Sequence, residues 1–167
     1  MSEEIIDNII ENVIIPTRLE YRMTPGMATA RFLKGMTERR ILGERCPVCA
    51  KVYVPPRGSC ATCAVATEEE VELAGTGTVT SFCVVNLQFY GSALEVPYVC
   101  ASVLLDGSDL PFFGMVGGMP WSEVRMGLRV TAEWVHDADL GPTFESIKYF
   151  KPTGEPDAAF ETYKEHL

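Results

Sequence analysis

The sequence predicts a mainly β protein in which N-terminal helices precede a metal-binding ribbon and a closed barrel of five strands. Apolar residues recur at helical spacing near the N-terminus, two CxxC pairs follow, and the remainder alternates between short strands and tight turns. A chain of 167 residues with 47% hydrophobic residues has the composition of a globular protein. We expect an N-terminal helical segment at 1–36, the ribbon at 37–68, the barrel at 69–152 and a C-terminal tail at 153–167.

The N-terminal segment has the pattern of an amphipathic helix. Isoleucine and valine residues share one face, acidic residues share the other, and Pro16 ends the helix. The apolar face must be covered by this chain or by another protein, and Ile6 and Ile10 are our candidates for a partner contact. A second, shorter helix is expected at 27–36.

Four cysteines form the pattern C-x2-C-x10-C-x2-C, and they are Cys46, Cys49, Cys60 and Cys63. The flanking stretches "RRILGERC" and "KVYVPP" read as short strands, and a hairpin between the pairs would bring all four thiolates to one ion. Four thiolates form the closed tetrahedral site typical of structural zinc. Iron in a rubredoxin-like site uses the same ligands and stays open as an alternative. A disulfide pairing needs an oxidising compartment, for which the sequence gives no sign.

The segment after residue 69 predicts the barrel. Residues 70–85 read as one long strand that bends at Gly75 and Gly77. Four further strands are expected at "YVCASVLLD", "LPFFGMV", "LRVTAEWVHD" and "TFESIKYF". Five strands with tight turns are typical of a small Greek-key barrel of the OB type, whereas an immunoglobulin-like sandwich needs about seven strands. Cys83 and Cys100 lie in apolar strands, so we expect both to be buried.

Charge is distributed unevenly along the chain. Residues 16–57 contain nine basic and three acidic residues, a net charge of +6, whereas residues 70–150 carry three basic and ten acidic residues, a net charge of -7. If an anion binds, the basic part is the expected host, with Arg57 first and Arg39 and Arg40 next; surface ion pairs are the alternative.

Neither a membrane span nor a secretion signal is expected. The apolar runs are short, and the N-terminus combines no basic start with a continuous apolar stretch. We therefore expect a cytoplasmic protein. The sequence also contains no GxSxG, P-loop, GxGxxG or HExxH motif, and we expect His136 and His166 to be surface residues.

The order of these motifs resembles a known family. A helix is followed by "RCPVC…VPPRGSCATC", "GTGTVTSF", "VPYVCASVLLD" and "MGLRVTAEWV", which is similar to the zinc-ribbon and OB-fold family of acyl-CoA-associated proteins, formerly a domain of unknown function. The resemblance runs from about residue 28 to residue 152. Ala50 and Ala64 stand where such turns often use glycine, which leaves the turn geometry open but not the metal.

The resemblance implies a non-catalytic subunit. Members of the family assemble with thiolase-like enzymes, namely ketothiolases, hydroxymethylglutaryl-CoA synthases and lipid-transfer-protein-type aldolases that shorten steroid side chains. The C-terminal tail looks similar to the aldolase partners, which implies a heterotetramer with a steroid side-chain retro-aldolase, an acyl-CoA ligand and structural zinc. Relatives of this kind can be fused to a hydratase domain, and if the pathway is the same, a separate hydratase is needed here.

One loop is our candidate for the partner contact, and it comprises Phe89, Tyr90, Val96, Pro97 and Tyr98. Phe112 and Phe113 are weaker candidates, because aromatic residues can simply fill the barrel. Two alternatives remain: a free acyl-CoA carrier without an enzyme partner, and a binder of single-stranded nucleic acid. The acidic barrel segment disfavours nucleic acid, since such binders use basic grooves with stacking aromatic residues.

Overall fold

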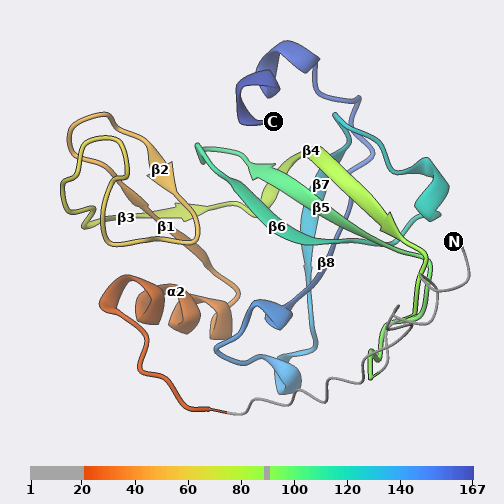
Figure 1. Ribbon diagram of the computed structural model, residues 1–167, viewed down its shortest axis with the longest axis horizontal. Helices are drawn as coiled ribbons and strands as arrows, with labels where there is room; N and C mark the ends of the chain where they lie inside the picture. The colour runs from red at the N-terminus through yellow and green to blue at the C-terminus, as the bar shows by residue number, and fades with distance from the viewer. Residues whose placement is uncertain (1–20, 89–90) are drawn as a thin grey trace, which may run out of the picture.

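A computed structural model describes residues 21–88 and 91–167 (Figure 1). The helix predicted before Pro16, with Ile6 and Ile10, lies outside the described residues. No helix in these two ranges combines the length and apolar character needed to cross a bilayer. The helix and the strands are α2 (Met27–Thr37), β1 (Ile41–Arg45), β2 (Val52–Tyr53), β3 (Glu69–Leu73), β4 (Thr76–Val85), β5 (Tyr98–Leu105), β6 (Pro111–Val116), β7 (Arg129–Trp134) and β8 (Ile147–Pro152).

The strands form two sheets. The ribbon sheet has the order β2-β1-β3, and the barrel closes in the order β4-β5-β6-β8-β7. Neighbouring strands are antiparallel except where β6 meets β8, and the parallel pair Val116 and Phe150 closes the barrel. The predicted fold class is confirmed: α2 precedes a cysteine-rich ribbon, and a closed five-stranded barrel follows (Figure 1).

The segment at 70–85 differs from the prediction of one bent strand. It forms two strands, of which β3 pairs with β1 in the ribbon sheet, while β4 pairs with β5 and β7 in the barrel. Gly75 lies between them with a φ of 78°, a left-handed conformation that glycine adopts without steric cost. At Gly77, a Cβ atom would lie 2.5 Å from the carbonyl oxygen of Leu104. Gly75 therefore lies where the chain changes sheet, whereas Gly77 lies inside β4 and allows the close approach of β5.

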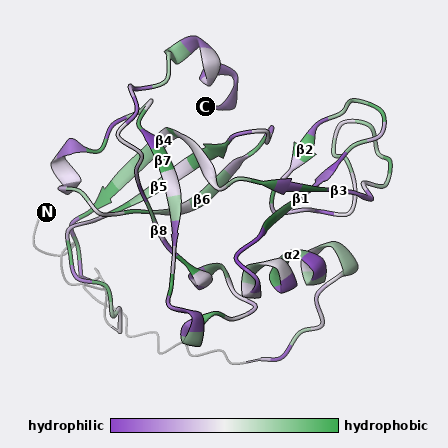
Figure 2. Cartoon of the chain, turned by 180° about the vertical axis from the view of Figure 1, so that it is seen from behind, coloured by the Kyte–Doolittle hydropathy of each residue, from purple (hydrophilic) through white to green (hydrophobic). Residues whose placement is uncertain are grey.

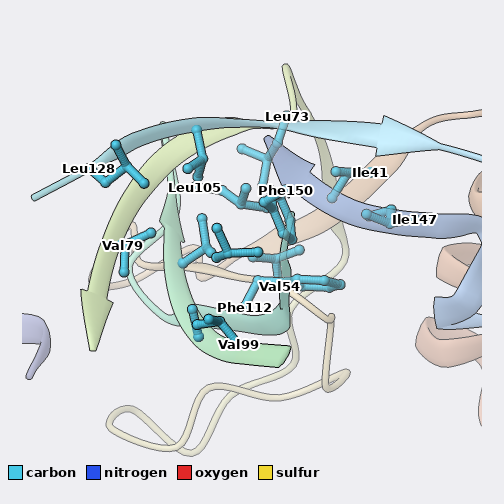
Figure 3. Packing of buried hydrophobic residues seen from close by; sticks show 14 of the residues in the cluster. Ile41, Val54, Leu73, Val79, Val99, Leu105, Phe112, Leu128, Ile147 and Phe150 are labelled. Carbon is cyan, nitrogen blue, oxygen red and sulfur yellow. The ribbon is translucent and has the colours of Figure 1, made fainter. Parts of the chain in front are cut away.

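Ribbon, helix and barrel share one hydrophobic core. The ring of Phe32 on α2 lies 5.3 Å from that of Phe144 and 6.4 Å from that of Phe112. Figure 3 shows Val54 of the ribbon segment among the barrel side chains, with Ile41 beside them. Helix α2 carries both polar and apolar residues (Figure 2), because only one of its faces packs against this core.

A buried carboxylate fixes the ribbon against α2. Glu44 on β1 is 1% exposed, and its oxygens accept hydrogen bonds from Arg31 Nη2 at 2.6 Å, Thr67 Oγ1 at 2.9 Å and the Gly58 backbone N–H at 3.2 Å. Burial of a carboxylate costs several kcal/mol unless hydrogen bonds and an opposite charge compensate it. The four groups come from the helix, β1 and both sides of the second cysteine pair, so they fix these segments together.

The turn between β5 and β6 connects the barrel to the ribbon. Asp109 accepts a hydrogen bond from the Val52 backbone N–H at 2.8 Å, and its own N–H donates to the Val52 carbonyl at 3.0 Å. A ring nitrogen of His166 lies 3.1 Å from the Asp109 carbonyl oxygen, which holds the C-terminal tail on the same turn. His166 is therefore half-buried rather than on the open surface, whereas His136 is exposed as expected.

The prediction that both barrel cysteines are buried is wrong. Cys83 is exposed and Cys100 is half-buried, although both were expected in the core. Cys100 lies between the core residues Val99 and Ala101, so it belongs to the outer face of β5, and Cys83 lies opposite Cys100 on β4 and shares that face. An apolar strand sequence did not reveal which face each cysteine takes.

Thr67→Val tests the buried carboxylate. It should lower the free energy of unfolding by about 2 kcal/mol, because a charged acceptor loses a buried donor at nearly constant side-chain volume. Thr80→Val is the control, because both threonines are at most 1% exposed but Thr80 donates to the neutral Ser102 carbonyl. The control should lower the free energy of unfolding by about 1 kcal/mol. Urea denaturation of the metal-loaded chains measures both values. Equal losses would contradict a special role for Glu44.

Candidate metal centre and its surroundings

The four predicted cysteines converge on one point. The Sγ atoms of Cys46, Cys49, Cys60 and Cys63 all lie within 4.8 Å of one another, and those of Cys49 and Cys60 are 3.7 Å apart. A tetrahedral zinc ion with Zn–S distances of about 2.3 Å places its sulfur ligands about 3.8 Å apart. The residues therefore fit zinc. Four protein ligands fill a tetrahedral shell and leave no position for a substrate, so the centre has the composition of a structural site.

The two cysteine pairs form equivalent turns. In the first, Cys46 Sγ accepts hydrogen bonds from the backbone N–H groups of Val48 and Cys49; in the second, Cys60 Sγ accepts one from Cys63. Ala50 and Ala64 follow the pairs with φ values of 61° and 54°, and their N–H groups donate to the carbonyls of Cys46 and Cys60. The chain thus adopts the left-handed turn without glycine, at a cost of about 1 kcal/mol each.

Tyr53 extends the centre beyond its ligands. Its hydroxyl lies 3.1 Å from Cys60 Sγ, and the ring is 4% exposed. This hydroxyl is the main reason that the pKa of Cys60 is lowered to about 6, since it donates to the thiolate. Hydrogen bonding to Cys49, followed by burial, raises the pKa of Cys63 to about 12. A divalent cation at the centre would favour the thiolate form of all four cysteines.

Apolar residues close the centre toward the barrel. Val65 and Leu110 pack against the cysteine cluster, and Leu110 belongs to the β5–β6 turn that also contains Asp109. The packing around the metal centre therefore includes a barrel residue as well as ribbon residues. Such an apolar shell limits the access of water to the sulfur ligands.

The predicted anion residues separate into two groups. Arg57 lines a cavity of about 510 Å³ together with Arg31 and the start of α2 at Gly26–Thr29. In contrast, Arg39 lies 2.6 Å from Asp137 and Arg40 lies 2.8 Å from Glu72, in the alternative role of surface ion pairs. Only Arg57 of the predicted three lines this cavity, and Arg31 is the arginine that the sequence did not suggest.

The predicted partner loop is only partly described. Phe89 and Tyr90 lie outside the described residues, while Val96 and Tyr98 are half-buried and Pro97 is exposed. The same loop contains Leu87 at 74% and Leu94 at 40% exposure. Of the weaker candidates, Phe112 fills the barrel at 2% exposure and Phe113 is 69% exposed.

Several residues of the site had no sequence signal. Glu44, Thr67 and Asp109 act through contacts with residues distant along the chain, Tyr53 contacts Cys60 seven residues further on, and no short motif marks any of the four. For Glu44, the only available sign was a glutamate in the short strand expected before the first cysteine pair.

Tyr53→Phe should weaken zinc binding about 10-fold, because residues that hydrogen-bond to metal ligands contribute this much to affinity and the ring packing is kept. Competition with a chromophoric zinc chelator at constant pH measures the dissociation constant. Tyr149→Phe serves as the control, since Tyr149 lies on β8 of the barrel. Equal affinity of the wild type and Tyr53→Phe would show that the hydroxyl has no role in metal binding.

Two curated relatives resemble this chain in sequence. A "Probable enoyl-CoA hydratase alpha subunit" of Thermomonospora curvata is 30% identical over 138 residues, which are 82% of this chain and 41% of that protein. This chain therefore spans less than half of that relative's length. A "DUF35 domain-containing scaffold protein" of Methanocaldococcus jannaschii is 32% identical over 116 residues, which are 67% of this chain and 81% of that protein.

Two solved structures have the same fold. A chain of the "Ltp2-ChsH2(DUF35) aldolase" superposes with a TM-score of 0.60 and 25% identity, covering 78% of this chain and 98% of that chain. A DUF35 family protein of unknown function from Sulfolobus solfataricus superposes with a TM-score of 0.56 and 21% identity, covering 76% of this chain and 84% of that chain.

Family models match both parts of the described chain. The ChsH2 rubredoxin-like zinc ribbon domain matches residues 34–69, and the ChsH2 C-terminal OB-fold domain matches residues 70–135. The ribbon match contains all four cysteines of the metal centre, and the OB-fold match begins within β3 of the ribbon sheet, ahead of the passage to the barrel at Gly75. The chain therefore belongs to the DUF35 family, with a ChsH2-type zinc ribbon followed by an OB-fold domain.

Proposed function

We propose that this chain is a non-catalytic, zinc-binding subunit that stabilises a thiolase-like enzyme acting on acyl-CoA. The single observation that carries the proposal is the closed metal centre: four cysteine ligands fill a tetrahedral ion and leave it no catalytic position. The match to almost the whole of one chain of the Ltp2-ChsH2 aldolase supports the role of a partner subunit. The similarity to relatives described as a scaffold protein and as a hydratase subunit also supports the role of a partner subunit.

An exposed apolar loop supports a protein contact. Leu87, Leu94 and Pro97 are exposed between β4 and β5, and Phe113 is exposed on β6. Contiguous apolar surface on a folded chain is typical of a protein interface. We assign the partner interface to this loop together with Phe89, Tyr90, Val96 and Tyr98, and to the predicted N-terminal helix with Ile6 and Ile10.

The partner would supply the chemistry. In a retro-aldol cleavage, a base of the partner removes the proton of a tertiary hydroxyl, the carbon-carbon bond breaks, and the thioester enolate is reprotonated. The finer proposal is a steroid side-chain acyl-CoA as substrate and a heterotetrameric complex. Its support is the similarity to the aldolase partner. Ketothiolases and hydroxymethylglutaryl-CoA synthases are the alternative partners.

The Arg57 cavity is our candidate for contact with the CoA phosphates. Arg57 brings positive charge to the cavity, the charge of Arg31 is paired with Glu44, Glu68 also lines the cavity, and the start of α2 brings backbone N–H groups to it. An arginine can donate two hydrogen bonds to a phosphate, and the helix dipole favours an anion at this end. The cavity of about 510 Å³ is large enough for a phosphate-bearing segment of CoA but not for the whole molecule.

Co-expression tests the subunit role. Together with its thiolase-like partner, the chain should give one peak on a sizing column, while the partner alone loses solubility or at least 10-fold activity because each subunit covers the other's apolar surface. Leu87→Asp should weaken the complex at least 10-fold. Phe160→Asp, which places the same charge at an exposed aromatic residue of the C-terminal tail, should not. Turnover of acyl-CoA by the isolated chain, or a partner that is fully active alone, would reject the proposal.

Arg57→Ala tests the anion site within the complex. It should raise the apparent KM for acyl-CoA about 10-fold at low salt, with kcat nearly unchanged, because a phosphate contact contributes equally to ground state and transition state. Arg39→Ala removes the same charge outside the cavity and should leave KM unchanged. An unchanged KM for Arg57→Ala would reject the anion site and leave the subunit role intact.

A further inference from the structure

Three sulfur-bearing side chains stand opposite one another on the barrel. In the register of the barrel strands, Cys83 of β4 pairs with Cys100 of β5, and Cys100 pairs on its other side with Met115 of β6. They form one row across three adjacent strands. None of them belongs to the zinc centre, whose ligands all lie in the ribbon between β1 and β3.

The alternation of β5 and β6, together with the pairing of Cys83 with Cys100, places the row on the outer face. Val99 and Ala101 flank Cys100, are at most 2% exposed and belong to the barrel core, so the side chain of Cys100 points outward. Met115 likewise precedes the core residue Val116, which is 8% exposed. Cys83 is exposed, whereas Cys100 and Met115 are half-buried. The row is therefore open to solvent at one end and partly sheltered at the other.

The spacing of paired strands suits a bridging ion. Side chains directly opposite each other have Cβ atoms about 4.5–5.5 Å apart, and a thiolate binds a soft metal at about 2.3 Å. One ion between two such cysteines can therefore contact both sulfurs. The charge of Cys83, after burial, contributes to raising the pKa of Cys100, which agrees with two thiols close together. The flexible side chain of Met115 can bring its thioether to the same ion.

We propose that Cys83, Cys100 and Met115 form a surface site for a soft monovalent metal ion, Cu(I). Thiolate and thioether ligands select Cu(I), whereas carboxylates and carbonyls favour Mg²⁺ or Ca²⁺. The neighbouring rows on this face, Ser81 with Ser102 and Val85 with Tyr98, offer neither carboxylate nor imidazole. The acidic barrel segment favours a cation over an anion. On binding, two thiols release two protons, and two thiolates and one thioether hold the ion without any change of oxidation state.

Titration of the full, zinc-loaded chain with Cu(I) under anaerobic conditions tests the site. The protein competes with a chromophoric Cu(I) chelator, and the loss of the chelator's absorbance measures the Cu(I) that the protein binds. We expect one Cu(I) per chain, with zinc still bound. Cys83→Ser should weaken this binding about 100-fold, and Met115→Leu about 10-fold, because a thiolate is the stronger ligand. Ser81→Ala, one pair further along the same face of β4, should bind as the wild type does.

The controls separate this site from the ribbon. Cys83 is exposed, so its replacement by serine should leave zinc content and far-ultraviolet circular dichroism unchanged, which verifies the fold. If Cu(I) instead displaces zinc in equal amount, the ion enters the ribbon and the proposal is wrong. Equal Cu(I) affinity of the wild type and Cys83→Ser would also overturn it.

Discussion

The packing of the ribbon against α2 depends on one buried carboxylate. The buried carboxylate of Glu44 accepts hydrogen bonds from three donors, which come from α2, from the turn at Gly58 and from Thr67 beyond the second cysteine pair. Satisfying this one group fixes the position of each segment relative to β1. Arg31, Gly58 and Thr67 also line the cavity next to Arg57, so the shape of the candidate anion site follows from how Glu44 is buried.

The metal centre and the barrel stabilise each other. A ribbon of this size cannot bury a core large enough to fold alone, and a structural ion compensates for part of that deficit. Here the barrel also stabilises the ribbon, because Leu110 packs on the cysteine cluster and Asp109 forms hydrogen bonds with the backbone of Val52. The ring of Phe32 between ribbon and barrel completes one continuous core. The ribbon and the barrel are therefore packed on each other rather than joined only by a linker.

The features that depend on residues close together in the sequence were predictable from local patterns. The spacing of Cys46, Cys49, Cys60 and Cys63 was sufficient for the metal cluster, and alternation with tight turns was sufficient for five barrel strands. Long-range pairing was not predictable in this way. The break at Gly75 depends on which sheet each half of the segment joins, and a bend and a change of sheet look the same in sequence.

The shared core restricts how such proteins can be recombined. The ribbon sheet takes β3 from the segment that leads directly into the barrel, and the β5–β6 turn of the barrel in turn packs on the metal cluster. An exchange of ribbons between two relatives would have to carry the flanking α2 and β3, and also the Asp109 turn, which lies beyond β4 and β5 in the sequence. Exchange at a single junction would place a foreign metal cluster against a β5–β6 turn that does not match its surface.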